Sequence, residues 1–275
     1  ASVYKNDYAF TFGRFVPAWG RGKVFRPLDM FVPQTFYLNM LSHRGVDAVA
    51  AKYFPSNLSS VEILAIPSMD TGHIIPSVER SIASDGKNHS VAAANAEIHI
   101  GTFDNNFIFL RDFVSEDNVL GFTSKGDAVG GLWSEICYAF NIAGNENTLK
   151  ASLGADYSFS KYFFVSAEYF YDESGMSDYN DYALMASLPR MTFGREYLML
   201  DFSVVTYAEL NCGITYVGNL VDKSYLLFPY FRHEILRDCH LGMALYSFNG
   251  QPGREFAGKG LGSYVLNTFL MMKFH

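Results

Sequence analysis

Apolar and polar residues alternate over long stretches of the chain, which is the pattern of β-strands with one buried face. In the strictest stretch, the apolar positions are Leu149, Ala151, Leu153, Ala155, Tyr157 and Phe159. The positions between them are Lys150, Ser152, Gly154, Asp156 and Ser158. An apolar face that persists over about ten residues opposite a polar one is typical of a strand that crosses a membrane and contacts lipid on one side.

The C-terminal stretch from Tyr264 to His275 alternates in the same way and predicts a closing strand. One of its faces reads Tyr264, Leu266, Thr268, Leu270, Met272 and Phe274. At the edge of a soluble sheet, so apolar a strand would be an aggregation site. Closure into a barrel removes the edge, so we expect this strand to pair with the first one, Tyr8–Phe15.

The whole pattern predicts about fourteen strands. They are Tyr8–Phe15, Val46–Phe54, Leu58–Ile66, Val91–Thr102, Asn106–Phe113, Val119–Ser124, Gly131–Asn141, Leu149–Phe159, Lys161–Asp172, Tyr197–Thr206, Leu210–Gly218, Ser224–Ile235, Cys239–Phe248 and Leu261–His275.

The connections between these strands sort by length. The long ones are Val16–Arg44, Pro67–Ser90, Glu173–Glu196 and Asn249–Gly260, with short helices expected at Pro76–Ala83 and Asp181–Leu188. The short turns lie near Pro55, Phe103, Lys125, Ser160, Tyr207 and Arg237. Long extracellular loops and short periplasmic turns are the arrangement of outer-membrane barrels. Residues 1–275 are therefore predicted to form one all-β domain, a closed antiparallel transmembrane β-barrel.

The composition agrees with a membrane barrel. The chain is 49% hydrophobic, 16% aromatic and 18% charged, whereas soluble chains are about 25% charged. The surplus of Tyr and Phe fits the aromatic girdles at the two membrane interfaces. No run of about 20 apolar residues occurs, so no membrane-spanning helix is expected. A formal net charge of −7 argues against a nucleic-acid partner, which requires a basic face.

No cofactor or metal ion is expected from the residue pattern. Cys137, Cys212 and Cys239 fall in three different predicted strands and lack C-x-x-C spacing. We interpret them as packed apolar side chains, with a single disulfide or a metal site as the alternative.

A short motif near the N-terminus carries a resemblance to a known family. Gly13-Arg14, Trp19-Gly20-Arg21-Gly22 and Arg26-Pro27-Leu28-Asp29 resemble the first-loop signature of porin-like outer-membrane barrels of Gram-negative and other diderm bacteria. The similarity continues through residues 45–48, residues 155–171 and the closing aromatic strand. It implies a channel-like fold in the outer membrane without specifying a solute. Members of this family extend further at the N-terminus, so strands upstream of residue 1 are left open.

Charged residues occur about once per predicted strand and are expected to face the lumen. They are Glu97, Arg111, Glu135, Lys150, Asp156, Glu168, Asp201, Arg232, Glu234 and Lys273. They either line a selective lumen or form an ionic network that fills a closed one. Because a lumen-facing charge contributes little to folding, we expect Lys150→Ala to be nearly neutral.

The first loop, residues 16–44, is a candidate to fold into the lumen as a constriction. The charged residues that bracket it are Arg14, Arg21, Lys23, Arg26 and Asp29. Its basic groups either meet acidic wall residues such as Glu135 or Glu168, or remain available to solute. Arginine forks suit anionic groups, but they also serve to tie a loop to the wall.

Two classes of function fit these features. One is a channel for passive or selective diffusion of small polar solutes, and the other is a structural or partner-binding barrel that anchors a surface assembly. The expected partners are outer-membrane lipid and small polar solutes, with a homo-oligomer or an assembly partner left open.

Two further alternatives remain. A hydrolase would need a histidine, a nucleophile and an orienting group at one rim, and His43, His73 and His89 fall near the predicted outer rim. No motif fixes their geometry, so no enzyme is expected. A soluble β-sandwich or lectin-like protein is the last alternative, and it would dissolve without detergent.

Overall fold

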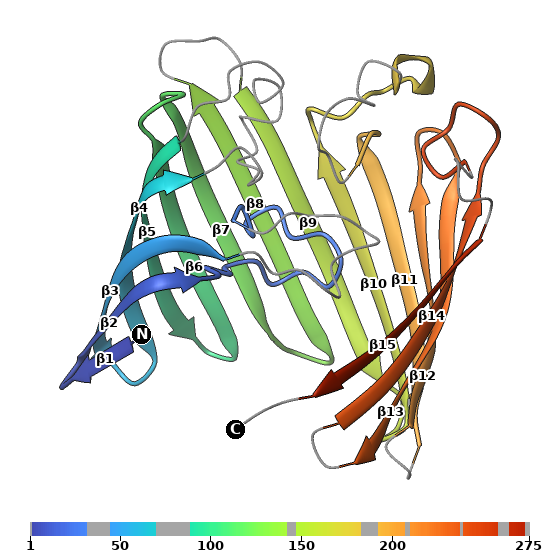
Figure 1. The fold of residues 1–275 in the computed structure, drawn as a ribbon, viewed down its shortest axis with the longest axis horizontal. Coiled ribbons are helices and arrows are strands. Elements are labelled where there is room, and N and C mark those ends of the chain that lie inside the picture. Colours follow the sequence, from blue (N-terminus) through green and yellow to red (C-terminus); the bar gives the residue numbers. More distant parts are fainter. Residues whose placement is uncertain are drawn as a thin grey trace.

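The described residues form one antiparallel sheet of 15 strands, in which each strand pairs with its neighbours in sequence (Figure 1). The computed structural model describes residues 2–31, 45–69, 89–141, 147–182, 192–206, 210–236, 239–257 and 264–272. The strands are β1 (Ser2–Lys5), β2 (Tyr8–Phe15), β3 (Val46–Ser56), β4 (Ser59–Met69), β5 (His89–Ile100), β6 (Phe103–Asp112), β7 (Asp117–Asp127), β8 (Gly131–Asn141), β9 (Asn147–Ser158), β10 (Phe163–Asp172), β11 (Glu196–Val205), β12 (Leu210–Asn219), β13 (Tyr225–Leu236), β14 (Cys239–Asn249) and β15 (Tyr264–Met272).

Helical structure is scarce in the part of the chain that the structure describes. The short 3-10 helix η2 (Tyr179–Asp181) begins after Asp178, whose carboxylate accepts the Asn180 N–H. The helix expected at Asp181–Leu188 is described only up to Tyr182, and the one expected at Pro76–Ala83 lies outside the described residues. Within the described ranges, no helix is long and apolar enough to cross a membrane.

The predicted strands are present, and β2 and β8 have the predicted bounds. The additional strand is β1, which pairs with β2 through the turn at residues 6–7. Four residues are too short to show an alternation, so the sequence pattern missed it.

Three of the predicted turns are displaced. Pro55, Phe103 and Lys125 lie inside β3, β6 and β7, and the chain turns instead at residues 57–58, 101–102 and 128–130. Gly101 has a φ of 66°, a left-handed conformation that glycine adopts readily. This glycine lets the β5–β6 hairpin turn two residues earlier than predicted.

The alternation places buried side chains, both polar and apolar, on the inner face of the curved sheet and exposed apolar groups on the outer face. On β9, Lys150 and Ser152 are buried, whereas Leu153 is 63% exposed. Large apolar side chains exposed on other strands include Phe10, Val49, Ile63, Phe107, Leu120, Ile136, Leu200, Ile214, Leu245 and Leu266. This exposed apolar outer surface is the one that the sequence pattern predicts to contact lipid.

The loops also sort between the two ends of the sheet. Short described turns at residues 6–7, 57–58, 101–102, 128–130 and 159–162 lie at one end. In an antiparallel sheet the connections alternate between ends, so the segments after β2, β10 and β14 leave from the other end (Figure 1).

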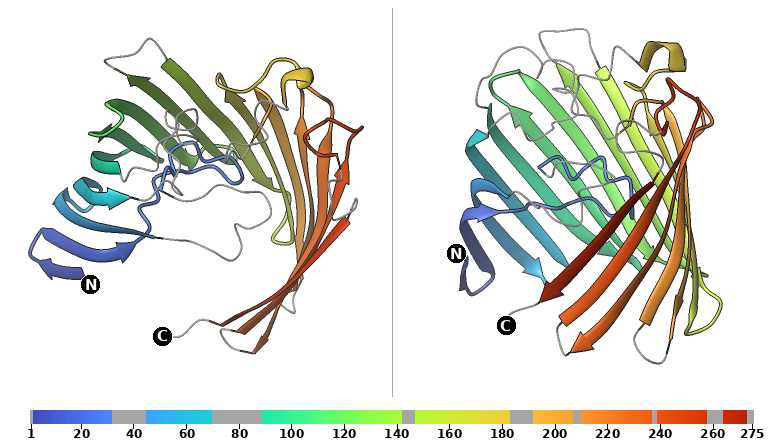
Figure 2. Two further views of the ribbon diagram at one scale, coloured as in Figure 1. Left: turned by 45° about the horizontal axis from the view of Figure 1, so that its top comes forward. Right: turned by 45° about the vertical axis from the view of Figure 1, so that its right-hand side comes forward.

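The predicted pairing of the closing strand with Tyr8–Phe15 is wrong, because both edges of β2 are occupied, by β1 and by β3. Among the described residues no ladder joins β15 to β1, and the two edges lie apart in both views of Figure 2. Unpaired strand edges are costly in hydrocarbon. A closed barrel is therefore still the form expected in a membrane.

Replacing Leu153 by arginine is expected to destabilise the folded protein by about 2–4 kcal/mol, because it puts a charge on the lipid-facing side near the middle of a strand. The measurement is urea-induced unfolding in lipid vesicles, with heat-modifiable migration on a gel as the readout of the folded fraction. Ala151→Ser, on the same face of β9, is the control for a polar change without charge. Equal stability of Leu153→Arg and the parent protein would show that this face does not contact lipid.

Candidate functional site

The segment Val16–Phe31, called here the inner segment, lies against the concave face of the sheet (Figures 1 and 2). Two glycines of the first-loop motif allow its tight path. A Cβ added to Gly20 would lie 2.9 Å from the Asp29 carboxylate, and one added to Gly22 would collide with the Phe25 carbonyl. Because Gly20 has no Cβ, its backbone comes close enough to Asp29 for the Gly20 N–H to donate to the Asp29 carboxylate at 2.7 Å.

Two wall carboxylates bind the backbone of the inner segment. Glu135 on β8 accepts the N–H groups of Arg21 and Gly22 in short hydrogen bonds. Glu168 on β10 accepts the N–H groups of Lys23, Val24 and Phe25 at 2.9, 3.0 and 3.0 Å. Both carboxylates are buried. Hydrogen bonds to a carboxylate are about twice as strong as neutral ones, so the pair fixes the segment across β8 to β10.

The basic side chains of the inner segment meet other acids. Arg21 contacts Glu97 on β5 at 2.9 Å, and Lys23 contacts Asp156 on β9 at 3.1 Å. The guanidinium of Arg26 lies 3.6 Å from Asp29 of the same segment. One of the two alternatives paired these basic groups with wall residues such as Glu135 or Glu168, but those two carboxylates accept main-chain N–H groups. The ion pairs are partly exposed, and such pairs contribute about 0–1 kcal/mol each.

Apolar contacts hold the inner segment on both halves of the sheet. Trp19, Leu28, Met30 and Phe31 belong to a buried cluster with side chains of β3 to β8. Phe25 belongs to a second cluster on β10 to β14, stacks on Phe170 at 4.7 Å and lies 5.7 Å from Tyr197. The segment therefore bridges two parts of the inner face.

Four other candidates lie on the inner face but outside these contacts. Lys150 is buried, with its Nζ 3.3 Å from Asp172. Asp201 accepts the Thr215 hydroxyl at 2.6 Å. On β13, Arg232 and Glu234 share the face of Tyr230, which packs against the second cluster. Lys273 lies outside the described residues.

Arg14 and Arg111 differ from the expectation, because both lie on the outer face. On β2, Arg14 follows the exposed Phe10 and Phe12, and its guanidinium pairs with the exposed Asp47 at 2.6 Å. On β6 the neighbours of Arg111, Leu110 and Asp112, are buried inside, so Arg111 points outward and lies over the Phe113 ring. Every charge was assumed to face inward. At strand ends, however, an outward charge costs only about 0–1 kcal/mol.

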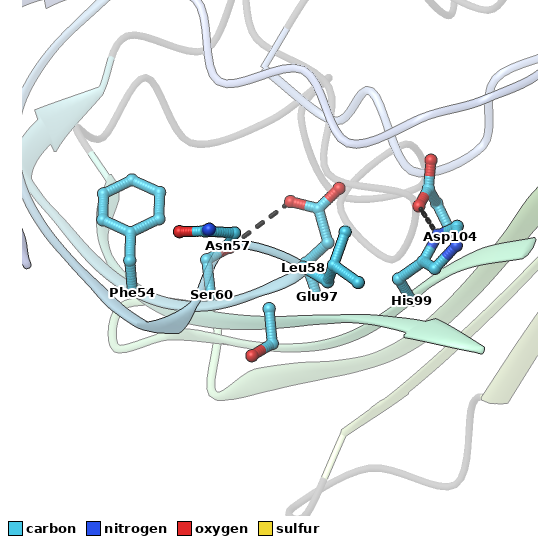
Figure 3. A pocket seen from close by; sticks show the side chains of 8 residues that line it. Phe54, Asn57, Leu58, Ser60, Glu97, His99 and Asp104 are labelled. Atoms are coloured by element: carbon cyan, nitrogen blue, oxygen red, sulfur yellow. Dashed lines mark hydrogen bonds and ion pairs between the residues drawn. The ribbon is translucent and has the colours of Figure 1, made fainter.

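A polar pocket of about 190 Å³ opens beside Glu97, at the short-turn end of β3 to β6. It is lined by Phe54, Asn57, Leu58, Ser59, Ser60, Glu97, His99 and Asp104 (Figure 3). Glu97 accepts the Ser60 hydroxyl at 3.3 Å, and His99 Nδ1 lies 2.7 Å from Asp104. These contacts satisfy the groups within the wall.

A second His–Asp pair, His89–Asp112 at 2.5 Å, is buried near the long-loop end. Within the described residues, no serine, threonine or cysteine donates to the imidazole of either pair, and no three metal-binding side chains cluster. His43 and His73 lie outside the described residues. Cys137, Cys212 and Cys239 lie on β8, β12 and β14 and form no disulfide.

Comparison with known proteins identifies structural neighbours. No protein-family model and no curated protein matches the sequence. The structure resembles OccAB3 of Acinetobacter baumannii with a TM-score of 0.58 and 11% identity, covering 98% of this chain and 76% of that one. It resembles OccAB4 of the same organism with a TM-score of 0.54 and 8% identity, covering 90% and 68%. The likeness confirms a porin-like outer-membrane β-barrel fold.

Proposed function

We propose that this protein is an outer-membrane channel for the diffusion of small polar solutes, in which the inner segment forms the constriction. The observation that carries the proposal is the anchoring of the inner segment inside the sheet by Glu135 and Glu168. A surface loop would not need two buried carboxylates to hold it against the wall. A segment that forms a constriction must be held in place in this way, because its position sets the width of the path.

Charges of both signs surround the inner segment. Arg21, Glu97 and Lys52 form one group, with Lys52 3.7 Å from Glu97, and Lys23 with Asp156 forms another. The side chains of both groups are about 28–41% exposed. Exposed charges of opposite sign favour polar over apolar solutes and set ion preference by their balance.

A structural barrel that anchors a surface assembly is the second candidate. The observation in its favour is the apolar filling of the interior, since the two buried clusters occupy the inner face on both sides of the inner segment. A lumen filled in this way needs no path for solute.

Single-channel recording in a planar bilayer tests the channel. The variant Lys23→Gln with Arg26→Gln removes two positive charges from the inner segment and leaves Asp156 and Asp29 unneutralised. In water at low salt a charge about 8 Å from a passing ion is worth about 0.5 kcal/mol. Removal of two positive charges therefore favours cations by about 1 kcal/mol and disfavours anions by about 1 kcal/mol, so the cation-to-anion permeability ratio should rise on the order of 30-fold. The readout is the reversal potential in a salt gradient.

Lys161→Gln, in the short turn after β9, is the control for charge removal away from the inner segment and should leave the reversal potential unchanged. A current whose ion preference does not respond to Lys23→Gln with Arg26→Gln would place the path elsewhere. No current from the parent protein or the variants would overturn the channel and support the anchor.

A further inference from the structure

The last loop, residues 251–257, is bound at the long-loop end of the sheet by several polar contacts. The Glu255 N–H donates to Asp222 at 2.8 Å, and the Phe256 N–H donates to the Ser224 hydroxyl at 3.1 Å. Arg254 donates to the Asp222 carbonyl, and its guanidinium lies over the Tyr179 ring. The loop is thus seated on the turn between β12 and β13.

At the centre of these contacts lies the buried carboxyl group of Glu255. It accepts the Tyr197 hydroxyl, the Asn219 amide at 2.7 Å and the Phe193 N–H at 3.2 Å. The Asn219 amide also donates to the Tyr182 hydroxyl at 2.7 Å. The group joins β11, β12 and the segment before β11 to the last loop.

The residue after Glu255 connects this network to the inner segment. Phe256 is fully buried in the same apolar cluster as Phe25 and Tyr197. Tyr197 therefore contacts Glu255 through its hydroxyl and the Phe25 side chain through its ring. If the last loop leaves its seat, Phe256 leaves the cluster that holds Phe25.

We propose that Glu255 is a pH-dependent clamp: its protonated carboxyl keeps the last loop seated and Phe25 of the inner segment packed through Phe256 and Tyr197, and its ionisation releases the loop and loosens the packing of Phe25. The clamp itself follows from the contacts of Glu255. Its effect on solute passage rests on the proposed channel function.

The electrostatics of the site favour the protonated form of Glu255 in the seated loop. Burial raises the pKa of Glu255 to about 7, against hydrogen bonds from Tyr197, Asn219 and Phe193 that lower it, and the Asp222 carboxylate raises it further. The other ionisable groups around it are Tyr182, whose pKa is raised by burial so that it stays neutral, Tyr197, and Arg254 of the same loop.

Protonation of Glu255 and seating of the last loop are linked, because the pKa of Glu255 differs between the seated and the released loop. In the released loop the Glu255 pKa returns to the ordinary value of 4.5, while in the seated loop it is about 7. Seating is therefore fully favoured below about pH 4.5 and is lost as pH rises to about 7. Between about pH 5.5 and about pH 8, the ratio of seated to released loop should fall on the order of 30-fold.

Hydrogen–deuterium exchange of the full chain in detergent micelles tests the clamp without any current. After correction for the intrinsic pH dependence of exchange, peptides covering residues 251–257 should lose protection between about pH 5.5 and about pH 8, on the order of tenfold or more. Peptides covering residues 22–28 should lose protection over the same pH range but to a smaller extent, because Glu135 and Glu168 still hold their N–H groups. Glu255→Gln imitates the protonated group, so it should fold and stay protected at both pH values. Glu116→Gln, an exposed carboxylate in the β6–β7 loop, is the matched control and should behave like the parent.

The outcomes separate the clamp from the channel. Protection of residues 251–257 that does not change with pH, or that changes equally in Glu255→Gln, would overturn the clamp. Loss of protection in residues 251–257 without any in residues 22–28 would overturn the link to the inner segment. A parent protein that shows the exchange pattern but carries no current supports the clamp and counts only against the channel.

Discussion

Replacing Glu168 by alanine is expected to weaken the docking of the inner segment by about 3 kcal/mol or more, because three N–H groups lose their shared carboxylate acceptor and each buried donor without a partner costs about 1–3 kcal/mol. These are the N–H groups of Lys23, Val24 and Phe25. The segment has cleavage sites for trypsin at Arg21 and Lys23, whereas Arg26 is followed by Pro27 and is not cut. In the parent protein the two sites should resist cleavage, and in Glu168→Ala they should be cut.

The experiment combines limited trypsin digestion with heat-modifiable migration, which shows that the barrel stays folded. Glu168→Gln retains an oxygen acceptor and should give intermediate protection. Asp201→Asn changes another inward carboxylate whose partners are Thr215 and Tyr230, so it should digest like the parent. Digestion of Glu168→Ala at the parent rate would show that Glu168 does not hold the segment.

The sequence predicted the sheet because its dominant signal is local. On β8 and β9 the apolar face is continuous, and any shift of one residue would turn that face into the interior. Turns were less certain, since the positions of Phe103 and Lys125 depend on pairing with the neighbouring strand. Closure was predicted at the wrong edge because β1 carries no periodic signal.

The site was predicted only in outline. Glu135 and Glu168 were recognised as acidic wall residues near the first loop, but binding to main-chain N–H groups depends on a backbone path that Gly20 and Gly22 permit. Arg14 and Arg111 were wrongly predicted to face the lumen, because the prediction relied on their charge and not on their position in the alternation of each strand. Leu110 and Asp112 face the interior, so the alternation along β6 would have placed Arg111, which lies between them, on the outer face.

Glu255 was not predicted at all. In sequence it is one acidic residue between Arg254 and Phe256 in a long loop, with no spacing that marks it. Its importance comes from Asn219 and Tyr197, which are 36 and 58 residues away. Contacts at such separation are set by the order of strands around the sheet rather than by local pattern.

The buried position of Lys150 changes what its removal should do. Its ammonium lies 3.3 Å from Asp172, and both side chains are almost fully buried, at 7% and 1% exposure. Removal of one partner from a buried ion pair costs about 3–5 kcal/mol, because the remaining buried charge loses its counter-ion. Lys150→Ala is therefore expected to be strongly destabilising rather than nearly neutral.

The measurement is the urea midpoint of unfolding in lipid vesicles at neutral pH. The double variant Lys150→Met with Asp172→Asn removes both charges, fills the space of the lysine stem and keeps an oxygen to accept the Ser174 N–H, which donates to Asp172 at 2.9 Å. It should recover most of the lost stability, since replacing a buried ion pair with neutral side chains of similar volume is often close to neutral. If Lys150→Ala unfolds at the parent midpoint, water reaches Asp172 and the pair is part of an open lumen; if the double variant is no more stable than Lys150→Ala, the loss comes from packing rather than from the unpaired charge.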